Sequence, residues 1–384
     1  MRRGAPTHSA ADMTNTTTIM PFSARVRRSP FFERSHAAGA KSYVVYNHML
    51  LPGYFTSHEV DYHHLKSAVQ LWDVGCERQV EVSGPDALRL VQMMTPRDVT
   101  GLTEGQCYYI PTVDADGGMT NDPVLLRVGP ERYWLSLSDS DLLLYCKALA
   151  GGLGLDVRVH EPHVAPLGIQ GPKADELVRR VWGEDAASIG YFRFCRVDVN
   201  GTLMVLARSG FSLQGGYELY FEGLEGGDLI WDQLMDAGRD IDVRAGSPSQ
   251  IERIEGGLLS YLTDMAQEHT PFEAGLGKFC TMDRETWCLA HAALLRKAEP
   301  VRQIRPVEVA GARAPMLVQP WPLRDRRGLP VGWITSCVWS PDFARNVSIA
   351  MVDRANWEPG TELVVETPDG LRSALVKSEF WGRT

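Results

Sequence analysis

Three segments of the sequence carry charged or amide side chains next to turns, where side chains can meet a ligand. The first is Asn121-Asp122-Pro123, which follows the turn at Gly117-Gly118 and precedes an apolar run. A carboxylate such as that of Asp122 can transfer protons in an enzyme. Asn and Asp also cap ordinary turns, so these residues alone leave both interpretations open.

The second segment is a glycine-rich loop that leads directly into an alternating strand. It runs from Ser209 through Gly210, Gly215 and Gly216 to Glu218. No helical pattern follows the loop, which argues against a phosphate-binding loop. A hairpin that exposes its glutamate to solvent also explains these residues.

The third segment, Glu252-Arg253-Ile254-Glu255, has helical spacing. Arg253 lies within one helical turn of both glutamates, so a row of solvated helix charges explains the pattern. The same arginine can instead pair with a carboxylate of a ligand. The residues alone do not decide between these alternatives.

The elements around these segments are a mixture of strands and helices. An alternating strand over 78–82 leads through Ser83-Gly84-Pro85 into a helical pattern over 86–94. The run over 166–172 leads in the same way into a helical pattern over 174–181. Because Gly-Pro is a common breaker, the two copies indicate either a diverged duplication or two independent turns.

The remaining pattern predicts an α+β chain with a separate C-terminal barrel. A hairpin is expected at 114–118. From about Ile304 onward, short strands alternate with Gly and Pro, which is typical of a small β-barrel or sandwich. We therefore expect a disordered leader over 1–22, an α/β region of two interleaved parts over 23–303 and a β-barrel domain over 304–384.

Composition narrows the classes of function. The chain has a net charge of −9 and a pI of about 5.6, without the basic runs typical of nucleic-acid binding. No stretch reaches the roughly 18 apolar residues of a membrane span. The seven cysteines are widely spaced and the histidines lack metal-ligand spacing. We therefore expect no metal and a reducing, cytoplasmic location, and a homodimer stays open.

The candidate segments resemble the signature positions of the glycine-cleavage T-protein (aminomethyltransferase) family. The stretches that carry the resemblance are Gly118…Asn121-Asp122, Gly210…Gly216-Tyr217-Glu218, Glu252-Arg253-Ile254-Glu255-Gly256 and the closing Val331-Gly332…Met351-Val352. The resemblance implies a three-domain cloverleaf around a central folate cleft, with a C-terminal β-barrel. It also implies that the α/β region over 23–303 is the folate-binding region.

Further stretches resemble a narrower group, the dimethylsulfoniopropionate (DMSP) demethylases. They include Tyr46-Asn47-His48-Met49, Glu77-Arg78-Gln79-Val80, Cys107-Tyr108-Tyr109 and Leu258-Leu259-Ser260-Tyr261. The resemblance implies an enzyme that transfers a methyl group from DMSP, a small zwitterion, to tetrahydrofolate. Three alternatives stay open: another onium or N-methyl donor such as a betaine or methylated amine, aminomethyl transfer, and a non-catalytic folate-binding scaffold.

The same resemblance implies roles for the candidate residues. Asp122 is the catalytic carboxylate, which orients the donor or accepts the proton that folate N5 loses. Contacts to tetrahydrofolate are expected from Glu218 at the pterin N–H edge, from Tyr220 and from Gln214. Contacts to the donor are expected from Tyr108, Tyr109, Phe211 and Arg253.

One loop departs from the demethylase pattern. The demethylases carry Trp and Lys where this sequence has Phe211 and Leu213. Trp is the best ring for holding a cation, and Lys pairs with carboxylates. The loss of both predicts either a different methyl donor or positions that do not face the donor.

Overall fold

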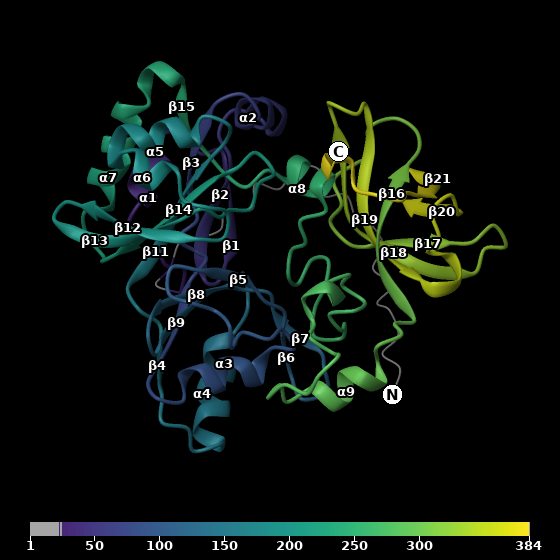
Figure 1. The fold of residues 1–384 in the computed structure, drawn as a ribbon. Coiled ribbons are helices and arrows are strands. Elements are labelled where there is room, and N and C mark those ends of the chain that lie inside the picture. The colour runs from purple at the N-terminus through teal and green to yellow at the C-terminus, as the bar shows by residue number, and fades with distance from the viewer. Residues whose placement is uncertain (1–22, 24, 384) are drawn as a thin grey trace.

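The computed structural model describes residue 23 and residues 25–383, so the predicted leader over 1–22 lies outside the described residues. Figure 1 shows two lobes of sheets and helices beside a β-barrel, with the helix α8 (Gln250–Gly256) between them. None of the helices in the described part of the chain is long and apolar enough to cross a membrane.

The larger sheet has the strand order β12-β13-β14-β11-β3-β15. Its strands are β3 (Val69–Asp73), β11 (Val164–Gln170), β12 (Phe194–Val199), β13 (Thr202–Ala207), β14 (Gly216–Glu222) and β15 (Val243–Gly246). β3 and β15 pair in parallel, and the other neighbours are antiparallel. Every residue of β3 and β11 is buried, so these strands are covered on both faces.

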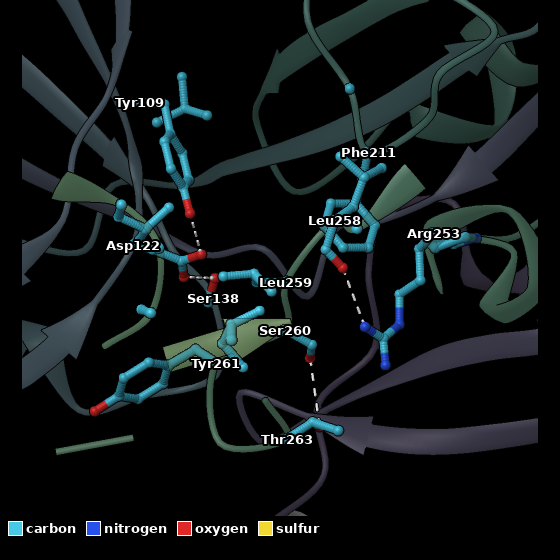
Figure 2. Close-up of a pocket in the computed structure, with 18 of the residues that line it drawn as sticks. Tyr109, Asp122, Ser138, Phe211, Arg253, Leu258, Leu259, Ser260, Tyr261 and Thr263 are labelled. Atoms are coloured by element: carbon cyan, nitrogen blue, oxygen red, sulfur yellow. Dashed lines mark hydrogen bonds between the residues drawn. The ribbon is translucent and has the colours of Figure 1, made fainter. Parts of the chain in front are cut away.

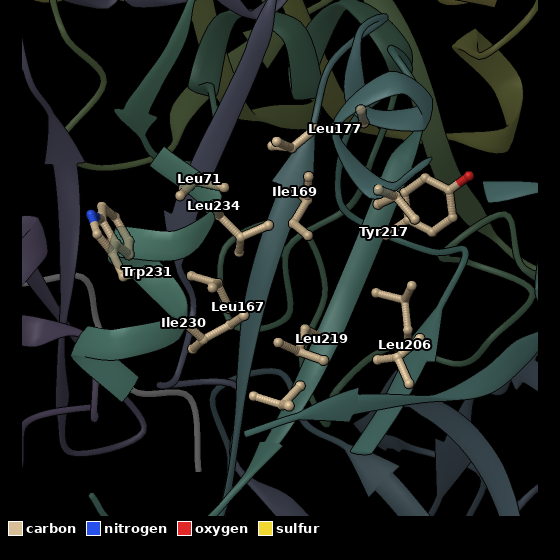
Figure 3. Close-up of a cluster of buried hydrophobic side chains, with 14 of the residues drawn as sticks. Leu71, Leu167, Ile169, Leu177, Leu206, Tyr217, Leu219, Ile230, Trp231 and Leu234 are labelled. Carbon is tan, nitrogen blue, oxygen red and sulfur yellow. The ribbon is translucent and has the colours of Figure 1, made fainter. Parts of the chain in front are cut away.

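Helices cover one face of this sheet, and an apolar core lies between the helices and the sheet. They are α5 (Ala174–Trp182), α6 (Glu184–Ala187) and α7 (Gly227–Ala237), followed by the 3-10 turn η1 (Arg239–Ile241). Figure 3 shows Leu167 and Ile169 of β11 in one apolar cluster with Ile230 and Leu234 of α7. This core fixes β14, the strand that carries Glu218.

The smaller sheet has the strand order β10-β4-β9-β8-β5. Its strands are β4 (Gln79–Ser83), β5 (Cys107–Tyr109), β8 (Val124–Gly129), β9 (Arg132–Ser136) and β10 (Arg158–His160). Its helices are α3 (Ala87–Met94) and α4 (Leu142–Gly152), and the hairpin predicted at 114–118 joins β6 (Thr112–Val113) to β7 (Met119–Asn121). In the sequence, β3 precedes the segment that forms the smaller sheet, and the other strands of the larger sheet follow that segment.

The repeated strand–turn–helix pattern has the same backbone conformation in both sheets. Gly84 follows β4 with a φ of 126°, and Gly171 follows β11 with a φ of 125°. A Cβ at these glycines would lie 2.7 Å from the carbonyl oxygen of Asp156 and 2.4 Å from that of Ala68. Glycine alone fits such a position without strain, which explains why both turns carry it, and the duplication stays a prediction.

The N-terminal part adds α1 (Phe32–Ala37), the hairpin β1 (Ser42–Tyr46)–β2 (Met49–Tyr54) and α2 (His58–Leu65). Asn47 and His48 form the hairpin turn with φ values of 48° and 61°. The buried Asn47 side chain donates to the carbonyl groups of Cys76 and Ser138. These bonds fix the hairpin beside the ends of β3 and β9.

After α8, a segment with η2 (Gly277–Phe279) and α9 (His291–Arg296) leads into the C-terminal barrel. The barrel is closed in the order β16-β19-β18-β17-β20-β21. Its elements are β16 (Arg302–Val309), β17 (Trp321–Arg324), β18 (Pro330–Ser340), β19 (Arg345–Asp353), η3 (Arg354–Asn356), β20 (Glu362–Thr367), β21 (Gly370–Val376) and η4 (Trp381–Arg383). The predicted α+β fold with a C-terminal β-barrel is therefore confirmed.

Candidate active site

A cavity of about 1540 Å³ lies where the two sheets, the β1–β2 hairpin and the barrel approach one another. Its wall takes residues from β1, the turn after β3, β5, the end of β9, the loop after β13 and the segment after α8. Of the site residues predicted from the sequence, the structure brings six to this wall: Tyr108, Tyr109, Asp122, Phe211, Glu218 and Arg253.

Asp122 follows β7 directly and is buried at the cavity wall. Figure 2 shows two hydroxyl groups donating to its carboxylate, Tyr109 Oη at 2.8 Å and Ser138 Oγ at 2.6 Å. Burial raises the pKa of Asp122 to about 6, and these hydrogen bonds oppose that shift only in part. A carboxyl group with this pKa can exchange a proton near neutral pH.

Asn121 holds the catalytic candidate in place from the preceding position. Its side-chain oxygen accepts from the backbone N–H of Asp122 at 2.9 Å and from that of Ser138 at 3.2 Å. Its amide nitrogen donates to the Ser138 carbonyl and to Ser140 Oγ. The Asn-Asp pair therefore caps a turn and presents a carboxylate, so the two interpretations open at the sequence level are compatible.

Glu218 points from β14 to the same cavity and is also buried. Ser209 Oγ donates to its carboxylate at 2.5 Å, and Tyr220 Oη lies 3.4 Å from the same oxygen. Burial raises the pKa of Glu218, and the two hydroxyl groups oppose that shift. The alternative of an exposed hairpin glutamate is therefore wrong.

The glycines of the second segment are required by the close approach of Gln170. Gly210 and Gly216 have φ values of 143° and 145°. A Cβ at these positions would lie 2.1 Å and 2.8 Å from the Gln170 side-chain nitrogen. That nitrogen donates to the carbonyl groups of Ser209 and Tyr217, which fixes the loop beside Glu218.

Glu77 is a cavity residue that the sequence analysis did not single out as a site residue. It lies in the turn between β3 and β4 and is half-buried. Burial and the nearby charges of Glu218 and Asp122 raise its pKa well above the usual range. In the sequence, the Glu-Arg pair at 77–78 is indistinguishable from ordinary surface charge. Ser138 was also missed, because a serine after an apolar strand carries no signal.

Aromatic side chains form much of the remaining wall. The Tyr109 ring packs edge-on against Phe279 at a centroid distance of 5.2 Å. Phe211 packs against an apolar cluster that contains Trp72. One face of Tyr108 already carries a cation of the protein, because the guanidinium of Arg97 lies 4.1 Å from its ring centroid. Tyr109 and Phe211 are therefore the better placed rings for a bound onium group.

Arg253 reaches the cavity wall but is largely occupied by the protein. Its guanidinium donates to Gln250, the Leu258 carbonyl, Asp264 and Ser336. These bonds leave one of about five N–H donors for a ligand. Glu255, the alternative partner from the sequence, accepts from Tyr62 and Ser340 instead. A donor contact by Arg253 stays a prediction.

Two predicted folate contacts do not reach the described cavity wall. Tyr220 is fully buried behind Glu218, with its ring 6.0 Å from that of Trp134. Gln214 donates to Glu252 at 3.3 Å. Both residues hold neighbours of the wall in place, and direct folate contacts by either stay a prediction.

The wall offers hydrogen-bond acceptors, aromatic rings and space, which suits binding and alignment of organic molecules. Within residues 23 and 25–383, no group of three or more His, Cys, Asp and Glu side chains could hold a metal ion. At the cavity wall, the carboxylates of Asp122 and Glu218 accept hydrogen bonds from hydroxyl groups only. A positively charged or N–H-rich ligand would complement them.

Comparison with known proteins decides the family. Residues 31–284 match the GCVT N-terminal domain, and residues 302–380 match the glycine cleavage T-protein C-terminal barrel domain. The chain belongs to the glycine cleavage T-protein family. The resemblance found in the sequence is thereby confirmed, and the cavity lies between the two matched regions.

Relatives within the T-protein family cover nearly the whole chain. The chain is 51% identical to dimethylsulfoniopropionate demethylase DmdA of Ruegeria pomeroyi, over 94% of this chain and 98% of that protein. It is 28% identical to the aminomethyltransferase of Moorella thermoacetica, over 94% and 99%. The crystal structure of glycine cleavage system aminomethyltransferase T from Bartonella henselae superposes with a TM-score of 0.81 at 20% identity, covering 92% of this chain and 97% of that one, which shows the shared fold.

Proposed function

We propose that this T-protein family member is a tetrahydrofolate-dependent demethylase. It transfers a methyl group from DMSP to tetrahydrofolate and yields 5-methyltetrahydrofolate and methylmercaptopropionate. The observation that carries the proposal is the 51% identity to a DMSP demethylase along 94% of the chain. The cavity supports it, because carboxylates and aromatic rings line a space of about 1540 Å³ that can hold a folate and a small donor together.

The chemistry needs alignment more than activation. A new bond joins the methyl carbon to folate N5, and the S–CH₃ bond breaks with its electron pair staying on sulfur. The sulfonium becomes a neutral thioether, and the positive charge appears on N5 until its proton leaves. Holding N5 in line with the S–CH₃ bond can supply roughly 7–11 kcal/mol of the barrier.

Asp122 is placed to receive the proton that N5 loses. Its carboxylate lies at the cavity wall with a pKa of about 6, so it is mostly ionised at neutral pH and can take up a proton. The hydroxyl groups of Tyr109 and Ser138 hold its two oxygens in place. Asp122 therefore acts as a proton acceptor in a fixed position.

Glu218 is the candidate partner for the pterin. Its carboxylate can accept two parallel hydrogen bonds from the 2-amino group and ring N–H. Ser209 and Tyr220 bond one oxygen, Oε2, and no donor in the described part of the chain reaches the other. The pterin N–H edge would then face Glu218, with N5 within reach of Asp122 in the same cavity and the donor beside Tyr109 and Phe211.

A second candidate function has one observation in its favour. Phe211 lines the cavity at the position where the demethylases have Trp, so a different onium or N-methyl donor would meet an altered wall. The relatives named aminomethyltransferase share 25–28% identity with this chain, which makes aminomethyl transfer the weaker alternative. A cytoplasmic location fits seven free cysteines.

Methyl transfer from a panel of donors tests the proposal. The purified protein is mixed with tetrahydrofolate and DMSP, betaine, dimethylglycine or sarcosine, and 5-methyltetrahydrofolate is quantified by chromatography. We expect turnover with DMSP and at least tenfold less with the other donors, which is about 1.4 kcal/mol of discrimination. If betaine or dimethylglycine supports turnover and DMSP does not, the proposal that DMSP is the donor is wrong.

A further inference from the structure

The Glu77 carboxylate lies at the cavity wall beside Asp122 and Glu218, and unlike those two it accepts no hydrogen bond from the described protein. Its backbone is fixed, because its N–H donates to the Val74 carbonyl at 2.9 Å and its own carbonyl accepts from the Gln79 side chain at 2.7 Å. Among the described residues, no donor reaches its carboxylate. A fixed backbone with an unpartnered carboxylate at the wall is arranged for a ligand.

The neighbouring arginine does not neutralise Glu77. The guanidinium of Arg78 pairs with Glu161, through a bond of 2.9 Å from Nε and a second bond from Nη2. The charged groups that act on Glu77 are instead the carboxylates of Glu218 and Asp122. Burial and these like charges hold the pKa of Glu77 above its usual range in the empty cavity. A cationic ligand beside the carboxylate lowers that pKa again, so binding of the cation and ionisation of Glu77 favour each other.

The other two carboxylates are already committed. Asp122 accepts from Tyr109 and Ser138, and Glu218 accepts from Ser209 and Tyr220. Under the proposed function they also receive the N5 proton and the pterin N–H groups. Glu77 remains available for a group that carries positive charge but has no N–H to donate, which describes a sulfonium.

We propose that Glu77 recognises the positive charge of the methyl donor, so that the cavity selects onium carboxylates over uncharged molecules of the same shape. This inference rests on the proposed function. A sulfonium spreads its charge over its carbon substituents and needs a nearby negative charge rather than a hydrogen-bond partner. The thioether product is neutral at sulfur, so the same residue would favour substrate binding without holding the product.

The test compares two analogues of DMSP, after an assay shows that neither yields 5-methyltetrahydrofolate under the conditions used. 3-(Trimethylammonio)propionate keeps the positive charge, and 4,4-dimethylpentanoate has the same shape with a neutral carbon in place of the nitrogen. Dissociation constants for both are measured by calorimetry with tetrahydrofolate present. We expect the wild type to prefer the cation, and Glu77→Gln to reduce that preference about tenfold to a hundredfold, as for the loss of one charged contact.

Matched variants separate this role from general electrostatics and from folding. Glu379→Gln makes the same charge change at the barrel side of the same cavity, and we expect it to leave the cation preference unchanged. Glu77→Asp keeps the charge and should retain most of the preference. Circular dichroism melts confirm that each variant folds.

Kinetics provide a second readout, and the outcomes are distinct. With DMSP, Glu77→Gln should raise KM about tenfold or more while kcat and the KM for tetrahydrofolate change less than about threefold. An unchanged cation preference, or an effect confined to folate, would overturn the role of Glu77. If the wild type fails to demethylate DMSP but Glu77→Gln still abolishes cation preference, the proposed donor fails and the inference stands.

Discussion

Two regions of this protein contain a buried carboxylate, and only one of them supplies a positively charged partner for it. Asp264, in the joint between α8 and the barrel, accepts from Arg253 at 2.8 Å and from Thr335 and Ser336 at 2.6 Å each. Asp122, at the cavity wall, accepts only from hydroxyl groups. One carboxylate has a buried cation as partner and the other has none.

The difference separates structural charge from functional charge. A carboxylate paired with a buried arginine joins two parts of the chain, and removing one partner leaves the other unpaired at high cost. A buried carboxylate without a cation destabilises the empty protein and becomes favourable when a ligand arrives. The cavity wall should therefore lose activity on substitution, while the joint should lose stability.

Asp122→Asn should give the largest effect on activity, and it tests the role of the buried carboxylate at the cavity wall. We expect kcat to fall about 10²- to 10⁴-fold, because the variant cannot accept the N5 proton. The melting temperature at pH 8 should not fall, since a buried charge without a cation is removed. A lower melting temperature together with the lost activity would assign Asp122 to structure instead.

Asp264→Asn should have the largest effect on stability. The substitution leaves Arg253 buried beside a neutral amide, so we expect the free energy of unfolding in urea to fall by about 3–5 kcal/mol. Asp342→Asn is the control, because its pair with Lys66 is partly exposed. That control should cost less than about 1 kcal/mol. Equal losses in the two variants would contradict the distinction.

Glu218→Gln should weaken folate without affecting folding. The variant keeps the shape of the side chain but replaces one acceptor with a donor facing the pterin edge. We expect tetrahydrofolate binding to weaken by about 1.5–3 kcal/mol, as for the loss of a charge-assisted bond. Calorimetric titration measures it, and unchanged affinity would remove Glu218 from the folate site.

The pH dependence of stability should reveal the unneutralised charge directly. Burial raises the pKa of Asp122 from 3.8 to about 6, so between these values the folded state binds more protons than the unfolded state. Above pH 6, the buried charge of Asp122 therefore lowers the free energy of unfolding by at most about 3 kcal/mol. This loss shrinks as the pH falls toward 4, because the folded state takes up the proton first. Asp122→Asn should exceed the wild type in urea stability at pH 7.5, and the gap should narrow at pH 4.5.

The sequence predicted the parts of the fold that depend on local patterns. The helix after Gly84 and the strand-rich region after Ile304 could be predicted, because glycine turns and alternating residues act over a few positions. Asp122 and Glu218 could be found because each carboxylate follows a glycine pair that marks a turn in the sequence. Their roles required the family resemblance.

The rest could not be predicted because it depends on contacts between distant segments. Arg253 has glutamates within one helical turn, yet its partner is Asp264, which the fold brings to it together with Ser336 of the barrel. Glu77 is next to Arg78 in sequence, but that arginine pairs with Glu161 from a distant loop. Spacing along the chain does not contain this information.

The loop after β13 offers the smallest and most selective comparison, between Phe211 and Leu213. Phe211 lines the cavity, whereas Leu213 packs at a joint: a Cβ on Gly256 or Gly382 would lie 2.5 or 2.7 Å from its Cδ1. Restoring the demethylase residue at each position should therefore have different results. Phe211→Trp should lower the KM for an onium donor about two- to fivefold, as for a modest gain in cation–π attraction.

Leu213→Lys should leave that KM within about twofold, since Leu213 is not among the residues that line the cavity. It lies instead beside Glu252, whose Oε1 accepts from the Leu213 N–H at 2.5 Å and whose buried Oε2 has no donor in the described part of the chain. Burial raises the pKa of Glu252 to about 7, so an added lysine should lower this pKa and raise stability at pH 8 by about 1 kcal/mol or less. A tenfold change in donor KM for Leu213→Lys would place position 213 in the donor site and reopen the identity of the donor.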